Sequence, residues 1–547
     1  MKTSVAMKVN QENLVKSLKF SFTNRSTVLG ELMQNARRAG ATQVSFDYDP
    51  VLSTLTVTDD GCGIDDIEAL LTVAQSGWDA ELMTQEHPFG IGFLSALYAC
   101  EHLALVSKCG RLTALTADVL SFKDLEVDVS VDWQGMTSLT LTGFGLDAAK
   151  IGDKLKTLAE GFPIPVFLNG ENLGRYAAFD VTTERSPSGL DYVETEIGWV
   201  YLRCIGGSSG VPCDGRYFKV YLQGLPIYEN ATWSRDVERT HIIHLDAARF
   251  YARLPDRDKL IDETEVVGLI DGVLDHLVRQ RMVALKSSLE PKAFVQTFAT
   301  LQYWKCLDLL NDVDFLPKQV VEAIDSYPVC STEVYAPFTR HPDQPVARSA
   351  IVGHEVEVVE IDDSIQYDGA ARYMFAWMRN SLIYQGNLDK GHWIHSMVRN
   401  LNDEEVTVEL VNETHSAGFH GSWVWVNVDF CDAYRIKVGS DIVEITDHAY
   451  YQGSDYGETV VMPSGDRSSA VIEQVATFKS EYDDYQQATH DDDCNAFFSF
   501  VIANTTSDPA EAMGQLLPEF TGCPSLFGKA FVVSLDEMGK VASVLAA

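Results

Sequence analysis

The chain has 547 residues, 46% of them hydrophobic and 10% aromatic, and its 42 basic and 79 acidic residues leave a formal net charge of −37. This length predicts about two to four domains, because one hydrophobic core rarely serves so long a chain. Proteins that bind nucleic acid usually carry a basic surface patch that neutralises phosphate charge. The charge therefore disfavours that class without excluding it, and acidity that serves only solubility is the alternative.

The sequence also predicts where the protein resides. No apolar stretch approaches the roughly 18–20 residues that span a bilayer, and Met1–Asn10 has no secretion signal. The ten cysteines lie scattered without CxxC pairs, which is typical of reduced, buried thiols. We therefore expect a cytoplasmic protein with no membrane contact.

Alternating helical and strand patterns over residues 1–170 predict an α/β domain. Ser26 is a plausible N-cap of the first clear helix, and Gly40 is its stop. The patterns predict helices over 26–39, 65–75, 91–101 and 147–160, strands over 44–48, 55–58 and 163–168, and further strands through Leu105, Leu115 and Leu139.

Two further regions follow. A second α/β unit is predicted over 171–288, with strands at 200–204 and 218–222 and a long helix over 263–287. Residues 289–547 open with helices and then alternate with period two, which predicts strands at 356–359, 406–410 and 423–428. The predicted fold is thus an α/β (α+β) N-terminal domain, an α/β middle domain and a strand-rich α+β C-terminal module.

A carboxylate and an amide lie four residues apart in the helix predicted over 26–39. Residues i and i+4 share a helix face, so Glu31 and Asn35 project side by side. This pair suits a base that activates water next to an oxygen ligand for Mg²⁺. An ordinary solvated helix face is the alternative.

An aspartate and two glycines follow the strand predicted over 55–58. Gly61 and Gly63 let the backbone turn sharply and let a flat ligand come close. The carboxylate of Asp59 could accept a hydrogen bond from an exocyclic amine such as that of adenine. A simple turn with an Asx cap is the alternative.

A third segment, His87–Leu97, places two glycines before an apolar helix. The first amides of such a helix and its positive dipole end can hold phosphate oxygens, here around Gly90, Gly92 and Phe93. The segment is not a P-loop, because no GK[ST] follows.

Together, in this order and context, the three segments resemble the N box and the two glycine boxes of the GHKL family, which includes gyrase, HtpG-type chaperones, histidine kinases and MutL. Ala74-Gln75-Ser76-Gly77 resembles the chaperone lid segment, and Thr137 resembles a late strand threonine of the adenine network. The resemblance is closest in style to the chaperone-like ATPases, and the phrase around Asn35 looks like a bacterial and mobile-element or phage subgroup.

The resemblance implies a Bergerat α+β sandwich over residues 1–170 that binds ATP and Mg²⁺. Glu31 would deprotonate the attacking water, Asn35 would bind the metal and Asp59 would accept from the adenine amino group. The other implied nucleotide contacts are Gly61, Gly63, Ser76, Gly77, Gly90, Gly92, Phe93 and Thr137, with 64–90 as a lid. Arg38 stands where the family often has an aspartate, so one supporting contact is not carried over.

A cation for the γ-phosphate is also implied. Leu254–Leu260 resembles the middle-domain segment that supplies an arginine, which would make Arg257 a charge-stabilising residue. The alternative is a helix start in which Arg257 pairs at the surface. Lys259 and Lys219 are further cations, although an edge-strand lysine is the favoured interpretation of Lys219.

Beyond residue 290 no family resemblance is found. His415, His420 and the run His490–Cys494 could be drawn as metal sites, but an acidic helix C-terminus running into a loop is the favoured interpretation of the run. Trp423 and Trp425 share one strand face and are most simply core residues, with a partner surface as the alternative.

These patterns lead to a functional hypothesis: an ATP-hydrolysing, chaperone-like or partner-remodelling switch acting on a protein client, with a possible ATP-dependent homodimer. The alternative is a DNA-directed clamp of the MutL, gyrase or MORC sort, which the charge and the absence of a basic run disfavour. A histidine kinase fits less well, because only about 25 residues precede the first box.

Overall fold

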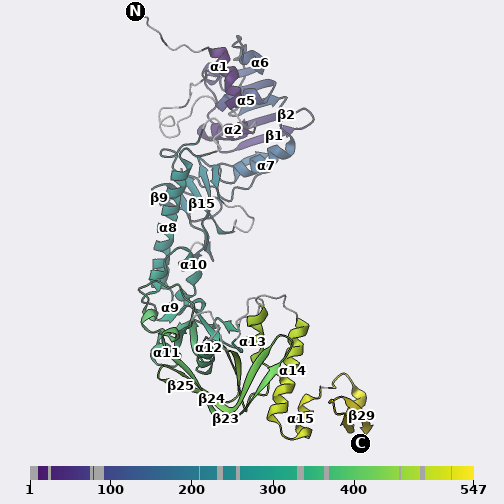
Figure 1. The fold of residues 1–547 in the computed structure, drawn as a ribbon. Helices are drawn as coiled ribbons and strands as arrows, with labels where there is room; N and C mark the ends of the chain where they lie inside the picture. Colours follow the sequence, from purple (N-terminus) through teal and green to yellow (C-terminus); the bar gives the residue numbers. More distant parts are fainter. Residues whose placement is uncertain are drawn as a thin grey trace, which may run out of the picture. The chain divides into compact units, whose positions relative to one another are not determined.

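The computed structural model describes residues 6, 10–21, 26–73, 78, 92–207, 210–230, 238–253, 259–328, 338–361, 369–454, 457–480, 487–518 and 520–547. The chain divides into two compact units, Met1–Glu290 with Ala299–Leu309, and Pro291–Phe298 with Leu310–Ala547 (Figure 1). Within the described ranges, no helix combines the length and the apolar character needed to cross a membrane.

The first unit begins with an eight-stranded sheet in the order β5-β4-β3-β6-β2-β1-β7-β8. Only β1 and β7 run parallel among these neighbours. The strands are β1 (Val44–Asp49), β2 (Thr54–Asp59), β3 (His102–Ser107), β4 (Gly110–Leu115), β5 (Val127–Asp128), β6 (Thr137–Thr142), β7 (Val166–Leu168) and β8 (Glu171–Asn172). The predicted strand at 163–168 is shorter than expected, since Pro163 and Pro165 lack the N–H that a sheet requires.

Helices pack against this sheet and share its core. They are α1 (Gln11–Leu18), α2 (Thr27–Arg38), α3 (Ile67–Leu71), α5 (Gly92–Ala99), α6 (Thr116–Val119) and α7 (Ala148–Ala159). The core side of α2 consists of Val28, Leu29, Leu32, Met33 and Ala36, the spacing of a helix with one apolar face. The predicted helices at 26–39 and 147–160 are confirmed, and the helix predicted at 91–101 is found over residues 92–99 of the described part of the chain. The one at 65–75 is shorter than predicted, because residues 72 and 73 are already non-helical.

A second sheet in the same unit has the order β14-β13-β15-β10-β9. Its strands, with the separate pair β11 and β12 and the helices that follow, are β9 (Val193–Thr195), β10 (Gly198–Tyr201), β11 (Cys204–Ile205), β12 (Val211–Pro212), β13 (Tyr217–Leu222), β14 (Leu225–Glu229), β15 (Thr240–Leu245), α8 (Glu263–Ser288) and α10 (Phe298–Tyr303). The strand predicted at 200–204 is divided, because the amide of Arg203 donates to Nδ1 of His241, 3.0 Å away, and not to a strand.

The second unit contains two five-stranded sheets and several helices. Its strands are β16 (Phe315–Leu316), β17 (Val321–Ile324), β18 (Thr339–Arg340), β19 (Val346–Ala347), β20 (Val358–Glu360), β21 (Leu382–Tyr384), β22 (Arg399–Asn400), β23 (Val406–His420), β24 (Trp425–Val438), β25 (Asp441–Ile445), β26 (Tyr450–Ser454), β27 (Gly457–Pro463), β28 (Phe531–Leu535) and β29 (Val541–Ala546). Its helices are α9 (Pro291–Val295), α11 (Arg348–Val352), α12 (Gly369–Met378), α13 (Val471–Ser480), α14 (Gln487–Thr505) and α15 (Pro509–Leu516).

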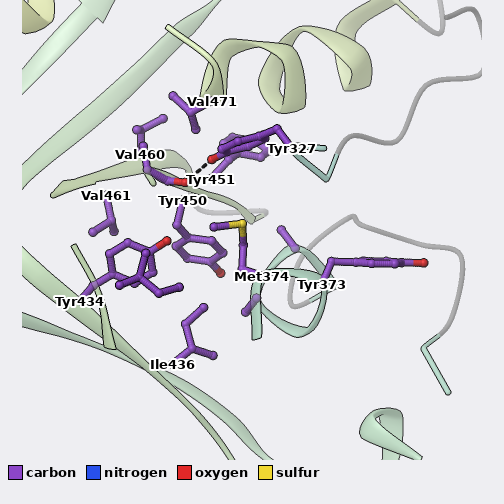
Figure 2. Close-up of a cluster of buried hydrophobic side chains, with 14 of the residues drawn as sticks. Tyr327, Tyr373, Met374, Tyr434, Ile436, Tyr450, Tyr451, Val460, Val461 and Val471 are labelled. Atoms are coloured by element: carbon purple, nitrogen blue, oxygen red, sulfur yellow. Dashed lines mark hydrogen bonds between the residues drawn. The ribbon is translucent and has the colours of Figure 1, made fainter. Parts of the chain in front are cut away.

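The core of the second unit is rich in tyrosine. Figure 2 shows Tyr327, Tyr434 and Tyr450 packed together beside Met374 of α12. The hydroxyl of Tyr327 donates to the carbonyl of Ala449, and that of Tyr434 donates to the carbonyl of His448, 2.8 Å away. Burial raises the pKa of Tyr327 and of Tyr434. Tyr327 and Tyr434 therefore act as structural side chains whose hydroxyl groups are hydrogen-bonded to backbone carbonyls.

Candidate functional site

The predicted water-activating residue lies where helices α2 and α5 meet. Glu31 is only 6% exposed, and Asn35 follows it one turn later, half-buried. A Cβ atom added to Gly92, the first residue of α5, would collide with Oε2 of Glu31. A side chain at position 92 would therefore have to displace this carboxylate, and the structure brings Glu31 to the predicted phosphate-binding helix.

Helix α5 presents its N-terminal end at this point. Its first residues are Gly92 and Phe93, and Oγ of Ser95 donates to the carbonyl of Gly92 at 2.6 Å. Phe93 is half-buried and packs against the core of the first sheet. Backbone amides in the first turn of a helix have no partner within the helix and face anions favourably. Gly90, Ser76 and Gly77 lie outside the described residues.

The end of strand β2 carries two adjacent aspartates with different environments. Oδ1 of Asp59 accepts from the amide of Gly61 at 3.0 Å, so the Asx turn considered for this motif is formed. Burial raises the pKa of Asp59, more than the Gly61 amide lowers it, and neighbouring Asp60 adds to the rise. Within the described residues, Oδ2 of Asp59 has no hydrogen-bond partner.

Asp60 instead connects the turn, by hydrogen bonds, to the segment between α2 and β1. It accepts from the amides of Thr42, at 2.7 Å, and Gln43, at 3.1 Å, and from the Thr42 hydroxyl. Partial burial works to raise the pKa of Asp60, but these hydrogen bonds outweigh it and hold the pKa below its ordinary value. Asp60 is therefore satisfied by protein, and Asp59 is the carboxylate suited to a ligand.

Thr137 stands beside Asp59 through the sheet. The two residues are cross-strand partners in the β2–β6 pair. Oγ1 of Thr137 lies 2.9 Å from Oγ of Ser107, and the amide of Ile64 donates to the same Ser107 oxygen at 2.8 Å. Ser107 was not predicted as a site residue from the sequence. The one feature that could have indicated it is a hydroxyl side chain at a position that the alternation of β3 places in the core.

The glycine turn is covered on one side by an indole ring that sequence reasoning also missed. Gly63 has φ of +77°, and a Cβ atom on it would lie 2.8 Å from Cζ2 of Trp133 and 3.1 Å from Cβ of Lys108. Nε1 of Trp133 donates to the carbonyl of Met136 at 2.8 Å. Glycine is thus required at position 63 both by its backbone conformation and by its neighbours.

Of the three side chains predicted as possible cations for the γ-phosphate, the structure describes only Lys259 and Lys219. Arg257 lies outside the described residues, and Lys259 is exposed. The edge-strand interpretation of Lys219 is wrong, because β13 lies between β14 and β15. Lys219 pairs with Glu160, and its Nζ lies 3.6 Å from Glu229.

The C-terminal candidates are explained by packing. His415 stacks on Phe430, and His420 lies edge-on to Trp425. Across the described parts of the chain, no group of three or more His, Cys, Asp or Glu residues could hold a metal ion. The core prediction for Trp425 is wrong, since its side chain is 61% exposed while Val424 and Val426 face the core.

The interpretation of His490–Cys494 as the end of an acidic helix is also wrong. The run lies in the first half of α14. Asp493 is 2% exposed and accepts from three backbone amides of the β23–β24 turn, those of Ser422, Trp423 and Val424, at 2.6, 2.8 and 3.0 Å. Asp493 therefore joins the helix to the turn.

Residues 23–138 match the family model described as histidine kinase-, DNA gyrase B-, and HSP90-like ATPase. No curated protein matches the chain significantly. The matched stretch contains Glu31 and Asn35 of α2, Asp59 of β2, Gly92 of α5 and Thr137 of β6. Over residues 23–138 the chain therefore carries an ATPase domain of the GHKL superfamily.

Proposed function

We propose that the protein is an ATP-driven conformational switch that binds Mg·ATP and hydrolyses it slowly. The domain carrying the site would span residues 1–170, followed by a transducer-like domain over 171–288 and a C-terminal module over 289–547. The observation that best supports the proposal is the contact between Glu31 and Gly92, because it sets a carboxylate against the start of the helix expected to hold phosphate.

The adenine end of the site rests on Asp59. Its Oδ2, which has no hydrogen-bond partner among the described residues, would accept a hydrogen bond from the adenine amino group, with Thr137 and Ser107 nearby. Gly61 and Gly63 would let the base come close to the backbone. A half-buried carboxylate with a raised pKa gains most from a ligand donor, because burial has removed the water that would otherwise solvate it.

At the phosphate end, Glu31 would accept the proton of the water that attacks the γ-phosphorus, while the bond to the ADP oxygen breaks. The first amides of α5, at Gly92 and Phe93, would hold phosphate oxygens. Asn35 offers a neutral oxygen beside Glu31, a donor type that suits Mg²⁺, and the ion when bound would neutralise phosphate charge. Arg257 would add a cation, by resemblance to the family.

The purpose of the cycle would be to change how the protein holds a protein client, and ATP-dependent pairing of two copies belongs to the same proposal. The net charge of −37 supports a protein rather than DNA as the target.

The proposed function is tested by Glu31→Ala. This variant should bind Mg·ATP with unchanged affinity by calorimetry and release phosphate about 10²–10⁴-fold more slowly, the contribution typical of a general base. The matched control is Glu126→Ala, which removes an exposed carboxylate from the same domain and should leave both values unchanged. Wild-type turnover in the Glu31→Ala protein would remove the proposed role of Glu31.

A further inference from the structure

Helix α2 has a second polar face, next to the one that carries Glu31 and Asn35. Gln34 and Arg38 share this face because they are four residues apart, and they are only 1% and 8% exposed. Polar side chains so deeply buried require partners. Neither side chain belongs to the nucleotide contacts proposed above.

Both side chains donate to one residue of the second sheet, Gln223. Nε2 of Gln34 donates to the backbone carbonyl of Gln223 at 2.8 Å, and Nη2 of Arg38 donates to the side-chain Oε1 of Gln223 at 3.4 Å. Arg37 donates from Nε and Nη2 to Oε1 of Gln34, at 3.0 and 2.9 Å, which fixes the orientation of that amide.

Gln223 lies in the tight turn between β13 and β14, here called the Gln223 turn (residues 222–225). Gln223 and Gly224 both have positive φ, +54° and +80°. A Cβ atom on Gly224 would lie 2.5 Å from Cδ of Pro163, and one on Gly30 of α2 would lie 3.4 Å from a methyl group of Leu225. The turn is therefore wedged between α2 and the segment that follows α7.

This arrangement gives the position of α2 two independent determinants. Its apolar side is fixed by the core of the first sheet, and its second polar face is fixed by the Gln223 turn. A displacement of the turn would be transmitted to Glu31, one helical turn from Gln34. Misplacing a reacting group by about 1 Å can cost about 10²-fold in rate.

We propose that Gln34 and Arg38 are positioning residues through which the Gln223 turn sets the place of Glu31 and Asn35 for hydrolysis. The inference rests on the proposed function of Glu31. It also gives a physical reason for an arginine at position 38: the side chain serves the neighbouring sheet and not the nucleotide. The second sheet then controls the rate of hydrolysis through α2, while Asp59, on β2, still holds the base.

The first test is Gln34→Leu in the full chain, which removes the donor to Gln223 and keeps a buried side chain of similar size. We expect kcat to fall about tenfold, part of the penalty for a misplaced catalytic group. The affinity for ADP without Mg²⁺ depends on Asp59 and not on Glu31, so it should stay within about twofold of the wild-type value. A tenfold loss of affinity would correspond to about 1.4 kcal/mol. Unchanged kcat, or kcat and ADP affinity falling together, would overturn the inference.

The matched control is Arg175→Met. Nη1 of Arg175 donates to the carbonyls of Phe162 and Pro163, at 3.0 and 2.7 Å, so this variant loosens the same junction without touching α2. It should lower the melting temperature and leave kcat unchanged below the transition. An equal loss of kcat in Arg175→Met and Gln34→Leu would mean that general loosening, and not positioning, is responsible.

A second pair of variants keeps the inference testable if Gln34→Leu does not fold. Gln223→Gly retains the positive φ and the backbone carbonyl but removes the acceptor of Arg38. Arg38→Met and Gln223→Gly should each lower kcat about threefold or more. The double variant should lose less than the product of the two single losses, because both variants remove the same Arg38–Gln223 hydrogen bond. Additive losses would overturn this pairing.

The proposed function and the positioning role fail in different ways. If the Glu31→Ala protein kept full turnover, the proposed function itself would fail. If the Glu31→Ala protein were inactive but the Gln34 and Arg38 variants had normal turnover, only the positioning role would be refuted.

Discussion

Two neighbouring aspartates show how burial and hydrogen bonding divide roles between identical side chains. Asp60 is satisfied by Thr42 and Gln43, and its pKa is lowered. Asp59 receives one amide hydrogen bond, and burial raises its pKa. A carboxylate that has lost solvent without gaining full protein partners is the one that a ligand donor stabilises most.

At this scale we predict that Asp59→Asn weakens ATP binding about tenfold or more, because a hydrogen bond to a charged group contributes about 1.5–3 kcal/mol. Calorimetric titration with ATP provides the measurement. Asp60→Asn is the matched control: it should lower the melting temperature, since the Asp60 carboxylate accepts from two backbone amides and the Thr42 hydroxyl, and leave the affinity for ATP unchanged. Equal affinity in the wild type and the Asp59→Asn protein would argue against the assigned adenine contact.

At the scale of elements, buried polar side chains join strands and helices that are distant in sequence. Asp493 holds the β23–β24 turn to α14. In the second sheet of the first unit, His241 donates to the carbonyl of Gly215 and His244 to that of Ala177, at 3.1 and 2.7 Å. Each of these side chains replaces water for a backbone group that the fold has buried.

Asp493→Ala should lower the free energy of unfolding of the second unit by about 3 kcal/mol or more, because three buried amides lose a charged acceptor. Chemical denaturation followed by tryptophan fluorescence measures the change. Asp492→Ala is the control from the same acidic run, and its side chain is exposed. Similar losses in the two variants would show that the run acts only through its charge.

Because His241 and His244 are buried, we expect the stability of the first unit to decrease at acidic pH. Burial lowers the pKa of His241 and of His244 from 6.5 to about 4. Both are neutral in the folded state, whereas the unfolded chain takes up protons below the ordinary pKa. Their contribution to stability is therefore complete above pH 6.5 and declines as the pH falls toward about 4.

Melting temperatures recorded between these two pH values provide the check. His244→Gln keeps a donor for the Ala177 carbonyl but cannot be protonated, so it should flatten the pH dependence at some cost in stability at neutral pH. His102→Gln, at an exposed position of β3, should leave the slope unchanged. A His244→Gln protein with the wild-type slope would contradict this assignment.

At the scale of the whole molecule, charge favours one class of partner over another. A net charge of −37 repels the phosphate backbone, and the sequence has no lysine–arginine cluster to offset it. The family match covers residues 23–138 of the 547. This charge supports our proposal of a protein client rather than DNA.

We accordingly predict that the full chain binds duplex DNA only weakly at about 150 mM salt, with a steep loss as salt rises. A mobility or filter assay at several salt concentrations, with and without ATP, measures this. Nanomolar DNA binding that accelerates ATP turnover would favour instead a clamp of the MutL, gyrase or MORC sort.

The sequence by itself determined the parts of this protein that depend on short-range pattern. The helical spacing of Glu31 and Asn35, the aspartate and glycines after β2, and the glycine that opens α5 all lie within single elements or turns. Backbone geometry places such residues before any tertiary contact forms. These segments predicted the ATPase family correctly, and helices with strong apolar periodicity were predicted with nearly correct ends.

Only the tertiary structure decided features that depend on which elements become neighbours. Ser107 lies at the site because β3 pairs with β6. Gln34 and Arg38 donate hydrogen bonds to Gln223, which is 189 and 185 residues away in sequence. Alternation along β24 indicated that Trp425 faces one side of a sheet, but not that this side is the exposed one. A local pattern fixes which side chains share a face, whereas the long-range packing of sheets and helices decides what covers that face.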